Sequence, residues 1–140
     1  MKENSIHVVA AIIEKDKRFL IAQRKAGSHM ASKWEFPGGK VERGESPEQS
    51  LMRELFEEFG IRAEIGDFIG ESTFDYGNVS IRLSAYRVTS FLGDFKLNDH
   101  EQIAWVKLHE LSHYDLSDAD IPIARKLTED IYLNHPKKPQ

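Results

Sequence analysis

The feature that most constrains the fold is a short segment near the middle of the chain, with a helix signal at each end. Ser46 is a good N-cap, Pro47 suits the first helical position, and Gln49 completes a capping box. Gly60 stands where a left-handed residue commonly ends a helix. Between these residues, apolar side chains recur at helical spacing: Leu51, Met52, Leu55, Phe56 and Phe59. The pattern predicts an amphipathic helix over residues 47–59.

The rest of the chain alternates between strand and helix patterns. Residues 6–13 form a nearly continuous β-branched apolar run, which predicts a buried strand. A charged turn over 15–18 leads into a second strand over 19–23, which suggests a hairpin. The later elements are predicted as three strands, one helical turn and a last helix, in the order 63–70, 79–90, 103–106, 109–113 and 120–133. This order predicts an α/β (α+β) fold, a mixed sheet with helices packed on it.

The composition narrows the class of protein. The chain has 140 residues, which fits one domain over 1–140, and no cysteine, which excludes disulfides and thiolate chemistry. Its formal net charge of −4 is unlike the basic surface of a protein that binds a nucleic acid duplex. The apolar run over 6–13 is too short to cross a membrane, and no signal-peptide cleavage site follows it. We therefore expect a cytoplasmic protein that binds neither a duplex nor a membrane.

The predicted helix carries acidic side chains that repel one another. Glu54, Glu57 and Glu58 are spaced i, i+3 and i+4, which makes them neighbours about 5–6 Å apart, and we expect them opposite the apolar face. Glu57 and Glu58 also fall in the last turn, where the helix dipole favours cations. One interpretation is a solvated acidic face with Arg53 as a local partner. The other is a bound Mg²⁺ or Mn²⁺, because these cations prefer carboxylate oxygens as ligands.

The surroundings of the helix favour the second interpretation. Gly38 and Gly39 lie just upstream, and glycines allow the backbone to approach a phosphate or a metal closely. From Gly39 to Ile61 the chain reads Gly-x5-Glu-x7-Arg-Glu-apolar-x-Glu-Glu-x-Gly-apolar. This pattern resembles the Nudix box of the Nudix hydrolases. Residues 34–40 are similar to the MutT branch of that family, and residues 116–122 look closer to the sister branch that hydrolyses CTP and modified pyrimidine triphosphates.

The resemblance implies the Nudix α/β/α sandwich and a reaction that depends on Mg²⁺ or Mn²⁺. The implied activity is hydrolysis of a nucleoside triphosphate to a nucleoside monophosphate and pyrophosphate, by a monomer or homodimer that clears modified nucleotides. The leading substrates are 8-oxo-dGTP and the set of CTP, dCTP and 5-modified pyrimidine triphosphates. Two alternatives stay open. One is another nucleoside diphosphate-linked substrate, such as a dinucleoside polyphosphate or an RNA 5′ end; the other is a non-catalytic domain that binds a nucleotide.

The resemblance also assigns roles in catalysis. The implied metal ligands are acids of the predicted helix, one acid before it and a backbone carbonyl: Glu54, Glu57, Glu58, Glu45 and Gly38. Arg53 is expected to orient a carboxylate, with Glu54 as its first candidate partner. The family places a further acid, as ligand or general base, before the strand that contains Trp105. Asp99 is the candidate there, Glu101 is the alternative, and a box glutamate is another candidate base; an exposed acid without a role is equally compatible with the sequence.

Contacts to the substrate are implied at several positions. Arg24 matches a phosphate-binding arginine, with a surface salt bridge as the alternative, and Gly39 gives the backbone access to a phosphate. Phe36 matches an aromatic residue near the nucleobase, with core packing as its alternative, and His29 is expected in the same pocket. Asp120 departs from the asparagine of MutT-like sequences. Its carboxyl group can read a guanine-type edge or the amino group of cytosine, and a helix N-cap is its structural alternative.

Overall fold

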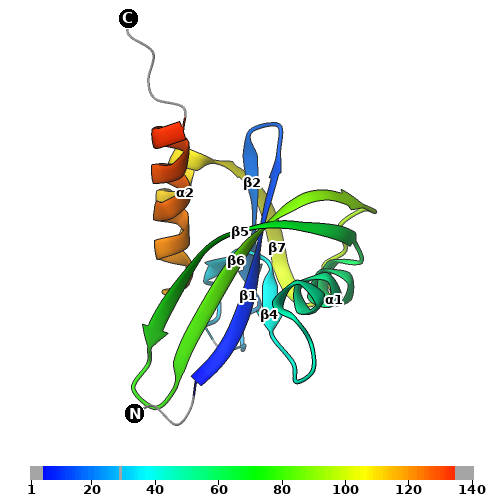
Figure 1. The fold of residues 1–140 in the computed structure, drawn as a ribbon, viewed down its shortest axis with the longest axis vertical. Helices are drawn as coiled ribbons and strands as arrows, with labels where there is room; N and C mark the ends of the chain where they lie inside the picture. Colours follow the sequence, from blue (N-terminus) through cyan, green and yellow to red (C-terminus); the bar gives the residue numbers. More distant parts are fainter. Residues whose placement is uncertain (1–4, 29, 135–140) are drawn as a thin grey trace, which may run out of the picture.

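The computed structural model describes residues 5–28 and 30–134. A mixed sheet lies between helix α1 on one side and helix α2 on the other (Figure 1). The elements follow one another in the order β1 (Ser5–Lys15), β2 (Arg18–Arg24), β3 (Trp34–Glu35), β4 (Gly38–Lys40), α1 (Pro47–Phe59), β5 (Arg62–Asp75), β6 (Ser80–Leu92), β7 (His100–Lys107), the 3₁₀ helix η1 (Leu108–His113) and α2 (Asp120–Asn134).

Strand β1 lies at the centre of the sheet. It pairs in parallel with β6 from Ser5 to Ile13, and β6 pairs antiparallel with β5 at the edge. On its other side, β1 pairs with β4 over residues 8–10 and with β2 only at the hairpin end, over residues 14–15. Strand β2 pairs instead with β3 and β7. The two strands of the hairpin therefore separate beyond the turn, and each takes other partners there.

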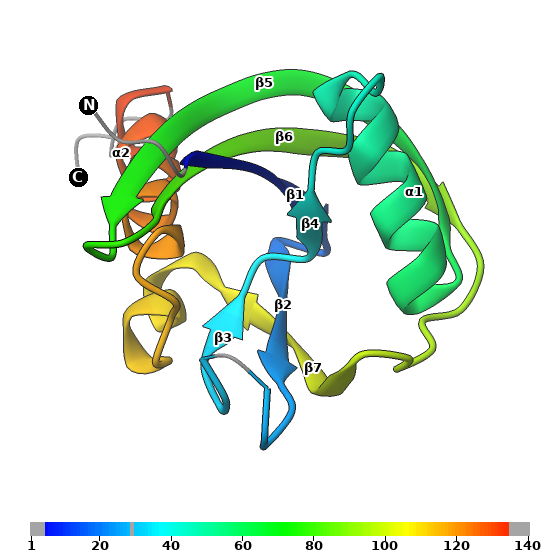
Figure 2. The same ribbon diagram turned by 90° about the horizontal axis from the view of Figure 1, so that it is seen from below.

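Alternate residues of β1 face opposite helices, because side chains point to opposite sides along a strand. Val9, Ala11 and Ile13 are buried in the hydrophobic cluster that includes the apolar face of α1. Ala10 and Ile12 are buried in a second cluster that includes the apolar residues of α2. The two helices thus cover opposite faces of the sheet (Figure 2). This arrangement confirms the predicted mixed sheet and the α/β/α sandwich.

Helix α1 begins and ends where the sequence predicts. The Ser46 hydroxyl accepts a hydrogen bond from the backbone N–H of Gln49 at 3.1 Å, and the Gln49 side chain accepts one from the Ser46 N–H at 2.9 Å. Gly60 ends the helix with a φ of 71°, a conformation that glycine adopts without steric cost. Both ends are therefore set by local contacts.

The later strands are longer than the sequence predicts. Strand β5 runs to Asp75 instead of residue 70, because its second half is paired residue by residue with β6. Register shifts between Glu64 and Gly70 break the regular alternation that a strand prediction depends on. Strand β7 begins at His100 instead of residue 103, because it pairs along β2. The predicted helical turn over 109–113 is confirmed as η1, and the last helix as α2.

The Ser46→Ala variant should lose the cap of α1. We expect its free energy of unfolding to fall by about 1 kcal/mol, because the backbone N–H of Gln49 loses its side-chain acceptor. Urea denaturation followed by circular dichroism measures this change. The matched control is Ser112→Ala, which changes an exposed serine of η1 and should unfold like the wild type. Equal stability of all three proteins would contradict a stabilising role of the cap.

Candidate active site

A cleft of about 460 Å³ lies between α1, strands β2 to β4 and the loop that leads into β7. It is lined by the residues Arg24, Lys25, Ser28, Glu35, Gly38, Gly39, Glu54, Glu58, Asn98, Asp99 and His100. Of the residues that the sequence singles out, the cleft collects Arg24, Gly38, Gly39, Glu54, Glu58 and Asp99. His29 lies outside the described residues.

Two carboxyl groups of α1 meet in this cleft. Glu54 and Glu58 are within hydrogen-bonding distance, and Glu58 is only 6% exposed. Burial and the neighbouring Glu54 raise the pKa of Glu58 well above its ordinary value, and the charges of Glu35 and Asp99 act in the same direction. The expectation that all the helix acids lie opposite the apolar face is wrong for Glu58. It follows Leu55 by three residues, which places it only about 60° from that apolar side chain around the helix axis.

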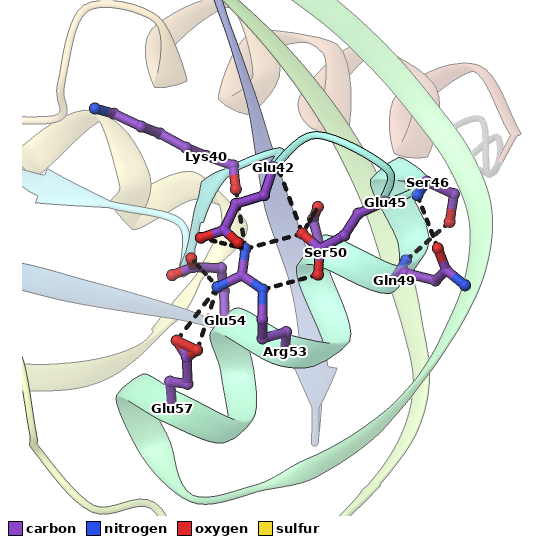
Figure 3. Close-up of polar contacts among 9 residues, drawn as sticks. All are labelled: Lys40, Glu42, Glu45, Ser46, Gln49, Ser50, Arg53, Glu54 and Glu57. Carbon is purple, nitrogen blue, oxygen red and sulfur yellow. Dashed lines mark hydrogen bonds and ion pairs between the residues drawn. The ribbon is translucent and has the colours of Figure 1, made fainter.

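Arg53 organises the acids on the outer side of the cleft (Figure 3). Its guanidinium binds both carboxylate oxygens of Glu45, at 2.9 and 3.1 Å, and donates to Glu54 at 2.8 Å. The expected contact with Glu54 is present, but the carboxylate that Arg53 binds in a bidentate manner is that of Glu45. This pairing, together with the Ser50 hydroxyl, lowers the pKa of Glu45 to about 2. Glu57 accepts a hydrogen bond from the same Arg53 nitrogen at 3.2 Å, is 55% exposed and is not among the residues that line the cleft.

Gly38 and Gly39 are required by close packing. A Cβ atom at Gly39 would collide with the carboxyl group of Glu54, and one at Gly38 would collide with the backbone carbonyl of Val9. Both contacts arise because β4 lies beside β1 and directly under α1. The two glycines therefore allow the backbone of β4 to form a wall of the cleft against the helix acids.

The loop before β7 is bound to the C-terminal end of α1. The backbone N–H of Lys96 donates to the carbonyl of Phe59 at 2.8 Å, and Asn98 donates to the carbonyls of Glu57 and Glu58 at 2.8 and 3.2 Å. These donors satisfy carbonyls that the last turn of a helix leaves without partners. The loop thereby carries Asp99 to the edge of the cleft.

Strand β7 contains a bulge that distinguishes the two candidate loop acids. Gln102 pairs with Gln23 of β2, whereas Arg24 pairs with His100, so Glu101 is an extra residue in β7. Glu101 is exposed and is not among the residues that line the cleft. This placement favours Asp99 over Glu101 as the acid that can act in the cleft.

Sequence reasoning missed Glu35 and His100. The Glu35 carboxylate accepts a hydrogen bond from Arg24 at 3.3 Å, and His100 Nε2 lies 2.9 Å from its second oxygen. His100 Nδ1 lies 3.6 Å from Glu58 Oε1. Glu35 stands between two aromatic residues, Trp34 and Phe36, so the alternation along a strand was a signal that its carboxylate points the other way. His100 gave no such signal, because its direction depends on the bulge.

Phe36 and Asp120 lie together on the α2 side of the sheet, whereas the acids of α1 lie on the opposite side. Phe36 is 3% exposed and belongs to the cluster that contains α2, which agrees with its core-packing alternative. Asp120 Oδ1 accepts a hydrogen bond from the backbone N–H of Phe36 at 3.0 Å. Burial, followed by the charge of Glu35, raises the pKa of Asp120 well above its ordinary value. The carboxyl group thus joins α2 to the segment between β3 and β4, a contact that the N-cap alternative did not include.

Known proteins share this fold. The family profile described as "NUDIX domain" matches residues 4–130. The chain belongs to the Nudix family. It is 44% identical to a CTP pyrophosphohydrolase of Escherichia coli (strain K12), over 84% of this chain and 87% of that protein. It is 34% identical to an 8-oxo-dGTP diphosphatase of the same organism, over 85% and 92% of the two chains.

A solved structure agrees with the fold. The solution structure of the E. coli ORF135 protein matches 96% of each chain with a TM-score of 0.84 and 39% identity. The chain is therefore a MutT-like Nudix hydrolase, homologous to CTP and 8-oxo-dGTP diphosphatases. In the part of the chain that the structure describes, none of the helices combines the length and hydropathy of a membrane span.

The donor set of this Nudix cleft fits a hard divalent cation. Its carboxylates are oxygen ligands of the kind that Mg²⁺ and Mn²⁺ prefer. The raised pKa of Glu58 shows an excess of negative charge, which a bound cation would offset. Among the described residues, no group of three or more histidine, aspartate or glutamate side chains already surrounds one ion position. Glu54 and Glu58 are the pair that the fold brings together.

The Glu58→Gln variant should be more stable than the wild type when divalent cations are removed. The pKa of Glu58 is raised in the folded state above its ordinary value of 4.5, so its contribution to stability is full below that value and is lost as the pH rises. Glutamine does not titrate. We therefore expect the melting temperature of the variant, measured in EDTA, to exceed that of the wild type by an amount that grows with pH.

The control for this experiment is Glu129→Gln, which changes an exposed acid on α2. Its melting temperature should differ from that of the wild type by little, at all pH values. If the difference in melting temperature between Glu58→Gln and the wild type shrank as the pH rose, the pKa of Glu58 would be lowered by folding. That result would contradict the raised pKa argued from its surroundings.

Proposed function

We propose that this Nudix protein is a nucleoside triphosphate pyrophosphohydrolase that depends on Mg²⁺ or Mn²⁺ and releases a nucleoside monophosphate and pyrophosphate. The observation that carries the proposal is the cleft, which is lined by both the Glu54–Glu58 pair and Arg24. A polyphosphate substrate needs both carboxylates that bind a cation and a positively charged side chain that binds a phosphate. The printed activities of the similar proteins, CTP pyrophosphohydrolase and 8-oxo-dGTP diphosphatase, support it.

The proposed cation ligands are the acids of α1 and a neighbouring carbonyl. Glu54 and Glu58 are the first two, Glu57 and the Gly38 carbonyl are further ligands, and Glu45 supports them through Arg53. When bound, the cation offsets the charge of the phosphates, makes a water molecule more acidic and stabilises the leaving oxygen. Arg53 donates to Glu54 Oε1 at 2.8 Å, so the carboxyl group keeps its orientation while the cation and substrate bind.

The remaining residues of the cleft complete the reaction. Arg24 and the glycine backbone of Gly39 bind the phosphates. Asp99 accepts a proton from the attacking water, whose oxygen forms a bond to phosphorus as the bond between the α and β phosphates breaks. Attack at the α phosphorus breaks the bond from that atom to the bridging oxygen, and pyrophosphate leaves with this oxygen. Attack at the β phosphorus breaks the bond on the other side of the bridging oxygen, so the nucleoside monophosphate leaves with it and the pyrophosphate carries the water oxygen.

The proposed base contact is a hydrogen bond to Asp120. Its Oδ1 is used by the Phe36 N–H, which leaves Oδ2 as the oxygen for a base edge. A carboxylate oxygen accepts from an exocyclic amino group, and cytosine and guanine both carry one. The proposed substrates are therefore nucleoside triphosphates whose bases carry an amino group: CTP, dCTP and their 5-modified forms, and 8-oxo-dGTP. Thymine and uracil lack this group and should be poor substrates.

Pyrophosphate release with Mg²⁺ should be measured across 8-oxo-dGTP, dGTP, CTP, dCTP, 5-methyl-dCTP and dTTP. We expect kcat/KM to be highest for one of the amino-bearing modified or cytosine nucleotides and lowest for dTTP. Removal of the cation with EDTA should abolish release. Glu58→Gln and Glu57→Gln should lower kcat about 100-fold or more, because cation ligation supplies several kcal/mol to the transition state.

The control variant is again Glu129→Gln, which should keep the wild-type rate. A wild-type rate in Glu58→Gln would contradict the assigned ligand. Absence of pyrophosphate from every triphosphate would overturn the proposed reaction. Dinucleoside polyphosphates and RNA 5′ ends would then be the next substrates to test, and nucleotide binding without turnover would indicate a non-catalytic Nudix domain.

The Asp120→Asn variant should change the ranking of bases while leaving hydrolysis intact. An amide offers a donor as well as an acceptor, so its pairing with cytosine and guanine edges differs from that of a carboxyl group. We expect the ratio of kcat/KM between 8-oxo-dGTP and dCTP to shift by about tenfold, the effect of roughly one changed hydrogen bond. The control is Asp115→Asn, an exposed acid whose contact is Lys33. An unchanged ratio with a lower melting temperature would assign Asp120 a purely structural role.

A further inference from the structure

We propose that His100 is a positioning residue that holds Glu35 and Glu58 in fixed relation across the floor of the cleft. This inference rests on the proposed function for its purpose and on the geometry of the described residues for its argument. His100 is the first residue of β7, is 3% exposed and lines the cleft together with both glutamates.

The bulge in β7 directs His100 toward α1. Along β7, Ile103 and Trp105 pack on the α1 side and Val106 packs on the α2 side. Continued alternation would place residue 100 on the α2 side with the other even-numbered residues. The extra residue Glu101 reverses this, so that His100 pairs with Arg24 and its side chain reaches α1.

The imidazole ring is held on three sides. It stacks on the ring of Phe59, with centroids 5.1 Å apart and planes at 15°. Its Nε2 lies 2.9 Å from Glu35 Oε2 and donates to that carboxylate. Its Nδ1 faces Glu58 Oε1 at 3.6 Å, too long for a hydrogen bond, and is a buried nitrogen without a hydrogen-bond partner among the described residues. A buried unpaired nitrogen is costly, so a ring present only for packing would be better replaced by phenylalanine.

These contacts form a continuous line across the cleft. Arg24 binds Glu35 at 3.3 Å, Glu35 binds His100, and His100 faces Glu58. The line joins the arginine proposed to bind phosphate to the acid proposed to bind the cation. Without the imidazole, the carboxyl groups of Glu35 and Glu58 would face each other across a gap with no group between them to fix their separation. His100 therefore sets the position of Glu58 relative to the phosphate side of the cleft.

The test compares His100→Phe with His100→Gln. Phenylalanine keeps the stacking on Phe59 and removes both nitrogens, whereas glutamine can place an amide donor where Nε2 lies and so keep the bond to Glu35. The first readout is Mn²⁺ affinity of the nucleotide-free protein, followed by electron paramagnetic resonance. We expect His100→Phe to weaken Mn²⁺ binding about 10- to 100-fold, the usual loss when a ligand's supporting contact is removed. His100→Gln should recover part of that loss.

The second readout is hydrolysis, in which His100→Phe should lower kcat more than it raises KM. The melting temperature in EDTA checks the packing role separately, and His7→Phe is the control, because His7 lies on the same sheet with Ser84 as its partner. Wild-type Mn²⁺ affinity in a folded His100→Phe would overturn the proposal, as would equal losses in both His100 variants. Should His100→Phe fail to fold, wild-type Mn²⁺ affinity in His100→Ala would overturn it. If the wild type hydrolysed no triphosphate while the Mn²⁺ difference persisted, the proposed function would fail and the positioning role would stand.

Discussion

The repulsion between Glu54 and Glu58 is the constraint on which the rest of the site depends. The two carboxyl groups are one helical turn apart, Glu58 is buried, and Glu35 and Asp99 add further negative charge. The surrounding structure keeps this unfavourable arrangement in place. Arg53 binds Glu54 from the outer side, Asn98 binds the last turn of α1, and the sheet supports the helix from beneath. The two carboxyl groups are thus held close together before a cation binds, although this arrangement is costly in the free protein. Such an arrangement is a form of preorganisation.

The parts of the fold that were predictable from the sequence are those set by local contacts. Helix α1 was predictable to the residue, because Ser46, Gln49 and Gly60 each act within four residues of their partners. Strands β5 and β7 were not, since their ends depend on pairing with β6 and β2. Register shifts also hid the alternation of β5. Local chemistry therefore located the helix that carries the acids, whereas long-range pairing decided what faces them.

The same division applies to the candidate site. The spacing of Glu54 and Glu58 placed them together correctly, but it could not show that Glu57 turns to Arg53. Asp120 was recognised as a departure from MutT-like sequences, yet its bond to the Phe36 N–H crosses 84 positions of the chain and is visible only in three dimensions. His100 was missed because a bulge, rather than its neighbours in sequence, decides its direction. The similarity to CTP and 8-oxo-dGTP diphosphatases agrees with the acids of the Nudix box.

The bulge at Glu101 separates the position of a residue in the sequence from the side of the sheet that it faces. Its carboxylate is exposed, so many residue types could replace it without changing the cleft. Its deletion would restore the regular alternation of β7 and leave His100 paired with Arg24 and directed toward α1, because neighbouring residues of a regular strand face opposite sides. A related chain that is one residue shorter here would therefore keep the same cleft, with its histidine directly before the residue that corresponds to Gln102. A one-residue gap in such a comparison would mark the loss of the bulge and not the loss of the cleft.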